Sequence, residues 1–120
     1  MRNDKQNVIV EISFQFALDI IEFSGLLEEN RKYIVARQVL RAGTSIGANI
    51  REAQNAESKL DFIHKLKISA KEADETDYWL LLCQKARNYP NPDNLLLKLS
   101  EIVKVLSRII STSKYNLKSN

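Results

Sequence analysis

Residues 41–53 read RAGTSIGANIREA, and this stretch decides the fold. It contains two glycines together with threonine, serine and asparagine, all of which are weak helix formers. Apolar residues nevertheless recur through it and before it at the three- and four-residue spacing of a helix: Val35, Val39, Ala42, Ile46, Ile50 and Ala53. The stretch is therefore predicted to form an amphipathic helix in which the small residues serve packing.

Two further sides of this predicted helix carry residues of interest. Gly43 and Gly47 share an edge with Ala36, where small side chains let a second helix approach closely. Asn49 lies beside the apolar stripe and is expected to hydrogen-bond to a neighbouring helix. The side opposite the stripe carries three arginines, which we call the arginine row: Arg37, Arg41 and Arg51.

Outward from this helix, apolar periodicity and stop signals predict four helices. Their expected ranges are about 8–27, 33–56, 59–88 and 92–111, followed by a frayed C-terminal tail over 112–120. Ser58 is placed to cap the third helix, and Asn91 with Pro92 to start the fourth. No strand periodicity competes. The sequence predicts an all-α protein, a single domain (1–120) folded as an up-down-up-down antiparallel four-helix bundle.

The bulk composition bounds the class of protein. The chain has 120 residues, 44% of them apolar, with only three glycines and two prolines. It contains neither an apolar run near 18 residues nor a signal-peptide pattern, so a cytoplasmic protein without a membrane partner is expected. The single cysteine, Cys83, cannot form an internal disulfide, which fits a reducing compartment.

The net charge of +3 is unevenly distributed along the chain. Residues 1–30 carry two basic and six acidic side chains, whereas residues 31–71 carry nine basic and three acidic. Two interpretations stay open. The charges of neighbouring helices balance one another within the fold, or the basic block attracts a polyanion.

The third helix is predicted to have a second apolar face, which favours self-association. The residues on this face are Ile68, Trp79 and Leu82, together with Glu72 and Glu75. An exposed apolar patch of this kind usually marks an interface, although Trp79 could instead pack at the edge of the bundle. The two glutamates are read as ion-pair partners for basic residues of another helix or subunit.

No constellation of residues predicts catalysis or a cofactor. One histidine and one cysteine cannot make a zinc set, and the Glu-x-x-His pair of a di-iron bundle is missing. The segment GTSIG (43–47) matches neither a nucleophile elbow nor a phosphate loop. The protein is therefore expected to be non-enzymatic, with no metal and no cofactor.

Residues 41–82 resemble the four-helix bundle proteins encoded in intervening sequences of bacterial 23S ribosomal RNA genes, a family that includes relatives of the accessory variability determinant of diversity-generating retroelements. The residues that carry the resemblance are Ser45, Ile46, Asn49, Ile50, Glu52, Ser58, Lys59, Phe62, Ala70, Glu72, Glu75, Trp79 and Leu80. Many relatives have glycine where this chain has Ala53, so its second helix is expected to end a little later.

The resemblance implies a homo-oligomer, with a pentamer favoured, and a non-catalytic role tied to structured RNA or to a nucleic-acid enzyme. Nucleic-acid contacts are then expected from the arginine row, supplemented by Lys59, Lys65, Lys67 and Lys71. Two alternatives stay open: the arginine row is a solvated helix face, or the protein is an adaptor whose basic face meets an acidic protein.

Overall fold

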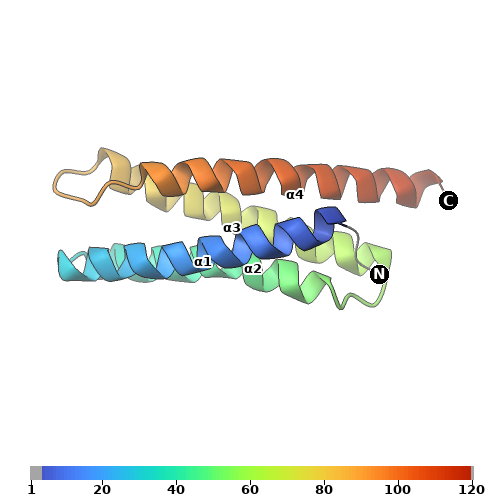
Figure 1. Cartoon of the computed structure of the whole chain (residues 1–120), viewed down its shortest axis with the longest axis horizontal. Coiled ribbons are helices and arrows are strands. Elements are labelled where there is room, and N and C mark those ends of the chain that lie inside the picture. Colours follow the sequence, from blue (N-terminus) through green and yellow to red (C-terminus); the bar gives the residue numbers. More distant parts are fainter. Residues whose placement is uncertain (1–3, 120) are drawn as a thin grey trace.

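The computed structural model describes residues 4–119, with side chains over 8–118. It contains four helices: α1 (Asp4–Glu29), α2 (Tyr33–Ala53), α3 (Lys59–Lys85) and α4 (Asp93–Ser119). The chain runs up and down a rod of 53 × 21 × 21 Å, and each helix is antiparallel to the next (Figure 1). The predicted all-α four-helix bundle is confirmed.

One continuous core runs along the axis of the rod. Each helix contributes a stripe at three- and four-residue spacing, as expected for amphipathic helices. The largest fully buried side chains are Phe16, Ile9, Ile20, Leu27, Ile46, Ile50, Leu66, Leu80, Leu99, Ile102, Leu106 and Val39. On α3 the stripe includes Ile63, whereas the neighbouring Phe62 is only half-buried.

The two connections at one end of the rod use residues in the left-handed region. Arg31 has φ 63° and follows α1, where its amide donates to Glu28 O and the Lys32 amide donates to Leu27 O. This pair of bonds is the Schellman motif, which satisfies carbonyls at a helix C-terminus. Asn88 has φ 61° and lies in the connection from α3 to α4, two residues before the first of its two prolines.

α1 extends beyond its predicted range of 8–27 at both ends, and three other helix ends also differ from the predicted ones. α2 ends at Ala53 rather than residue 56, because the next three amides bond to carbonyls three residues back, which tightens the chain into a turn. α3 ends at Lys85 rather than residue 88, because Ala86 is extended (ψ 146°). The largest correction is at the C-terminus, where residues 112–119 continue α4 instead of fraying. This segment contains no glycine or proline.

The two predicted helix starts are capped as expected. The Ser58 hydroxyl accepts from the Asp61 amide at 3.0 Å, and Asp61 in return accepts from the Glu57 amide at 3.1 Å. Asn91 Oδ1 accepts from the Asp93 amide at 2.8 Å. These bonds satisfy amides that have no partner within their own helix.

Candidate nucleic-acid and protein interfaces

The small-residue edge of α2 lies directly on α1. A Cβ added to Gly43 would lie 2.7 Å from Ile20 Cγ1, and one added to Gly47 would lie 3.2 Å from Ser13 O. A Cβ at position 43 would require Ile20 to move, and one at position 47 would require α1 to shift by a few tenths of an ångström, so both glycines serve this close approach. Asn49 differs from expectation. Its amide donates to Ser45 O at 2.8 Å within α2, because the helix leaves that carbonyl within reach of its side chain.

The arginine row is interrupted at Arg41. The guanidinium of Arg41 donates to Gln38 Oε1 at 3.1 and 2.9 Å, and it forms ion pairs with Glu72 and Glu75 of α3. Arg41 therefore bridges α2 and α3 instead of projecting freely into solvent. Its side chain is 49% exposed, so the pairs are solvent-screened and weak.

The other two arginines of the row differ in their surroundings. The Arg51 guanidinium lies 5.8 Å from the centroid of the Phe14 ring on α1, a cation–π contact. Arg37 is exposed and has no ion-pair or hydrogen-bond partner among the described residues. The row is thus not a uniform set of free cations, and only Arg37 is uncommitted.

Glu75 joins the arginine row to the predicted interface on α3. Its carboxylate accepts from Trp79 Nε1 at 3.0 Å as well as from Arg41. The hydrogen bond from Trp79 and the bond and charge of Arg41 lower the pKa of Glu75. Glu72 and Glu75 were expected to pair with a basic residue of another helix or of another subunit. Within the chain, both pair with Arg41 of α2.

The apolar members of the predicted interface are not equally exposed. Trp79 is half-buried against the core, and Tyr78 meets its ring edge-on at 5.5 Å. Ile68 is also half-buried. Leu82 is 40% exposed, beside the equally exposed Leu81. The apolar surface of α3 therefore centres on residues 78–82, and Trp79 contributes to the fold as well as to this surface.

The lysines predicted to bind nucleic acid divide into two groups. Lys65 lies between the carboxylates of Glu52 (3.8 Å) and Asp61 (3.9 Å), which neutralise it. Lys59, Lys67 and Lys71 are exposed and form no ion pair with any described carboxylate. These three lysines leave the first half of α3 with positive charge that no described carboxylate neutralises.

A groove between α1 and α2 was not anticipated from the sequence. It has a volume of about 320 Å³ and is lined by Val10, Phe14, Ala17, Leu18, Ile21, Thr44, Gly47, Ala48 and Arg51. Phe14 and Ile21 are each more than half exposed. The signal was present as a second apolar periodicity in α1, at positions 10, 14, 17, 18 and 21.

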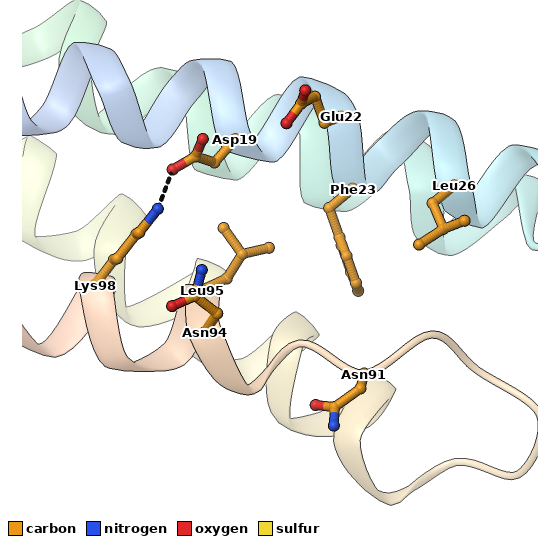
Figure 2. Close-up of a pocket in the computed structure, with 8 residues that line it drawn as sticks. All are labelled: Asp19, Glu22, Phe23, Leu26, Asn91, Asn94, Leu95 and Lys98. Atoms are coloured by element: carbon orange, nitrogen blue, oxygen red, sulfur yellow. Dashed lines mark hydrogen bonds and ion pairs between the residues drawn. The ribbon is translucent and has the colours of Figure 1, made fainter.

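A shallower hollow of about 270 Å³ lies between α1 and α4. Figure 2 shows Phe23 and Leu95 reaching into it from the two helices, with Asp19 and Lys98 bonded at its edge. Lys98 Nζ donates to Asp19 Oδ2 at 2.7 Å, so the acid is already neutralised. Within the described part of the chain, no three histidine, cysteine, aspartate or glutamate side chains gather as a metal site.

Comparison with known proteins shows to which protein family the chain belongs. The profile of the 23S rRNA-intervening sequence protein family matches residues 5–111. The chain belongs to the 23S rRNA-intervening sequence protein family. A crystal structure of a protein of unknown function from the S23 ribosomal protein family of Bacteroides thetaiotaomicron is similar, with 42% identity and a TM-score of 0.83. The similarity covers 89% of this chain and 98% of that one. No curated protein matches the chain at a significant level.

In this member of the 23S rRNA-intervening sequence family, most residues that carry the resemblance have structural contacts. Ser45 donates to Arg41 O at 2.6 Å, Ser58 caps α3, and Glu52 pairs with Lys65. Glu75 holds the Trp79 indole. The residues that carry the resemblance therefore mainly stabilise the bundle. Of the unneutralised lysines only Lys59 is among them, and none of the residues that carry the resemblance lines the α1–α2 groove.

No described helix combines the length and apolar character needed to cross a membrane.

Proposed function

We propose that this protein is a non-enzymatic, homo-oligomeric four-helix bundle that binds structured RNA, or a nucleoprotein, through a basic helix face. The observation that carries the proposal is a group of exposed cations on α2 and the first half of α3 that form no ion pair with a described carboxylate and no cation–π contact: Arg37, Lys59, Lys67 and Lys71. Membership of a family named for 23S rRNA intervening sequences supports RNA as the polyanion.

The physical basis of this binding is the release of counterions from phosphates. Each lysine or arginine that meets a phosphate displaces condensed cations, so affinity falls steeply as salt is added. One cysteine and one histidine cannot form a zinc knuckle, so recognition would follow backbone shape and charge rather than the reading of bases.

Self-association is the second part of the proposal, with a pentamer favoured by the family resemblance. The apolar side chains left on the surface support it. Leu81 and Leu82 on α3 and Phe14 and Ile21 on α1 are each at least 40% exposed. Repeating the basic face around an assembly would raise avidity for a long polyanion without new contacts.

The alternative function is a protein–protein adaptor or scaffold without nucleic-acid contact. The α1–α2 groove favours it, because an apolar hollow flanked by Arg51 suits an acidic amphipathic segment of another protein. A nucleic-acid enzyme is one partner class for such an adaptor.

Two measurements test the proposal. Fluorescence anisotropy with a structured 23S rRNA fragment should give binding at low salt whose affinity declines steeply between 50 and 200 mM salt. Absence of binding at low salt would favour the adaptor instead.

Light scattering should give a mass several times that of the 13.8 kDa chain. Leu82→Gln should lower that mass, whereas Leu97→Gln on α4, where the side chain is 64% exposed, should leave it unchanged. A monomer at tens of micromolar wild-type protein, where weak assemblies form, would contradict self-association.

A further inference from the structure

The last turns of α4 lie beside the first turns of α3, and this junction is strongly basic. Lys67 on α3 and Lys114 on α4 lie close enough across this junction for Lys67 to lower the pKa of Lys114. Lys71 lies one turn from Lys67 and Lys118 one turn from Lys114, and all four are exposed. We call these residues the α3–α4 lysine patch: Lys67, Lys71, Lys114 and Lys118.

No carboxylate within the described residues forms an ion pair with any lysine of the patch. The sequence next to the patch offers no carboxylate partner, because residues 62–71 and 102–119 contain no aspartate or glutamate. The pKa of Lys114 is lowered mainly by Lys67, with smaller contributions from desolvation and from the charge of Lys118. Like charges thus lie near one another in the patch, and their repulsion opposes folding.

Helix-dipole effects account for only part of this arrangement. A cation in the last turn of a helix interacts favourably with the negative end of the dipole, which explains Lys118. It does not explain why α3 presents Lys67 to Lys114, because Lys67 lies in the N-terminal half of α3, where a cation gains nothing from the dipole.

Hydroxyl groups extend the patch along α4. Ser107 and Ser111 precede Lys114 and Lys118 at the spacing of one helix face, and both are exposed. The four positions from 107 to 118 span about 16 Å. Lysines and serine hydroxyls are typical contacts to phosphate oxygens, and a duplex presents several phosphates over that length.

We propose that the α3–α4 lysine patch binds the phosphodiester backbone of RNA. This inference rests on the proposed function and names its site: the junction of α3 and α4 takes the place of the α2 arginine row. Arg41 and Arg51 of that row already contact Glu72, Glu75 and Phe14, whereas a bound phosphate would give the patch the counter-charge that the fold does not supply.

The test compares two variants with equal loss of charge. The patch variant changes all four lysines of the patch to glutamine. The control variant changes four exposed basic residues that lie outside the patch face and form no ion pair with a described carboxylate: Arg31, Lys85, Arg87 and Arg108. Binding of a duplex RNA oligonucleotide is measured by anisotropy across a salt series, and circular dichroism monitors folding.

The expected result follows from the number of phosphates that the patch neutralises. Four neutralised phosphates contribute about 3.6 to the slope of log affinity against log salt, which is on the order of 10²-fold between 50 and 200 mM. The patch variant should lose most of that slope, and the control variant should retain it. Equal slopes in the two variants, with wild-type binding intact, would overturn the patch and leave the proposed function standing. Absence of wild-type binding would overturn both.

A charge reversal separates binding from stability. Lys67→Glu replaces the repulsion of Lys114 by an attraction to it, so the melting temperature should stay level or rise while RNA affinity falls. A fall in affinity only as large as that of Lys85→Glu would contradict the patch. Tight binding of polyglutamate through the same four lysines, without RNA binding, would show a docking site for an acidic protein and overturn the inference.

Discussion

Replacing Gly43 with alanine should destabilise the bundle, although alanine is the better helix former. The new Cβ would lie 2.7 Å from Ile20 Cγ1 and 2.9 Å from both Cγ2 and Cδ1. Ile20 is fully buried and β-branched, so rotating its side chain moves one methyl group away only by moving another in. Overpacking of this kind costs about 1–3 kcal/mol, against about 1 kcal/mol gained in helix propensity.

Gly25 provides the matched control. A Cβ added there meets nothing within 4 Å, so Gly25→Ala should gain the propensity term alone, about 1 kcal/mol. Because both variants share that term, the difference between them isolates packing. It should be about 1–3 kcal/mol, or roughly 4 °C in melting temperature for each kcal/mol in a domain of this size. Urea unfolding at one fixed protein concentration measures it, since self-association would make stability concentration-dependent.

A second variant background tests whether the clash with Ile20 causes the destabilisation. Ile20→Ala removes all three atoms that the new Cβ would meet, at a cost of about 2–5 kcal/mol for the cavity. In that background, Gly43→Ala should become stabilising, because the added methyl group enters free space. If Gly43→Ala stabilises the wild-type protein as much as Gly25→Ala does, the close approach of α1 and α2 does not depend on glycine and the reasoning fails.

Three further outcomes are expected. Glu75→Gln should be less stable than wild type at neutral pH. Because Trp79 and Arg41 lower the pKa of Glu75, this difference is present above the unfolded value of 4.5 and should shrink as pH falls through the lower folded value; a pH-independent difference would refute it. Burial raises the pKa of Cys83 to about 11, so a thiol reagent at pH 8 should label it only as fast as the protein opens, and immediate labelling of the native protein would count against this. Trp79→Ala should reduce the mass measured by light scattering more than it reduces helicity; intact mass with lost helicity would make Trp79 purely a core residue.

The sequence was sufficient for the parts of the fold that depend on periodicity. The apolar stripes predicted four helices, and the caps at Ser58 and Asn91 follow from side chains that accept amide bonds locally. The end of α4 was missed because "STSK" (111–114) lacks a strong apolar signal, while helix continuation there depends on neighbours in space.

The candidate site was less predictable than the fold. The spacing of residues on α2 places Arg41 on an outward face, but it does not show that Glu72 and Glu75 of α3 lie opposite. Nor does it show that Lys114 lies near Lys67, since these residues are far apart in the chain. Pairings between helices depend on the rotation of each helix in the bundle, which apolar periodicity defines only coarsely.

The order of the helices around the rod has a consequence for folding kinetics. Three of the four packed seams join helices adjacent in the chain, and only α1 with α4 brings the two terminal helices together (Figure 1). A topology dominated by local contacts avoids the entropy of closing long loops early, so folding on the microsecond-to-millisecond scale is expected. The α1–α4 seam, which contains the hollow at Asp19 and Lys98, would close last and open first. Backbone amides facing that seam should then exchange with solvent sooner than those of the tightly packed α1–α2 pair.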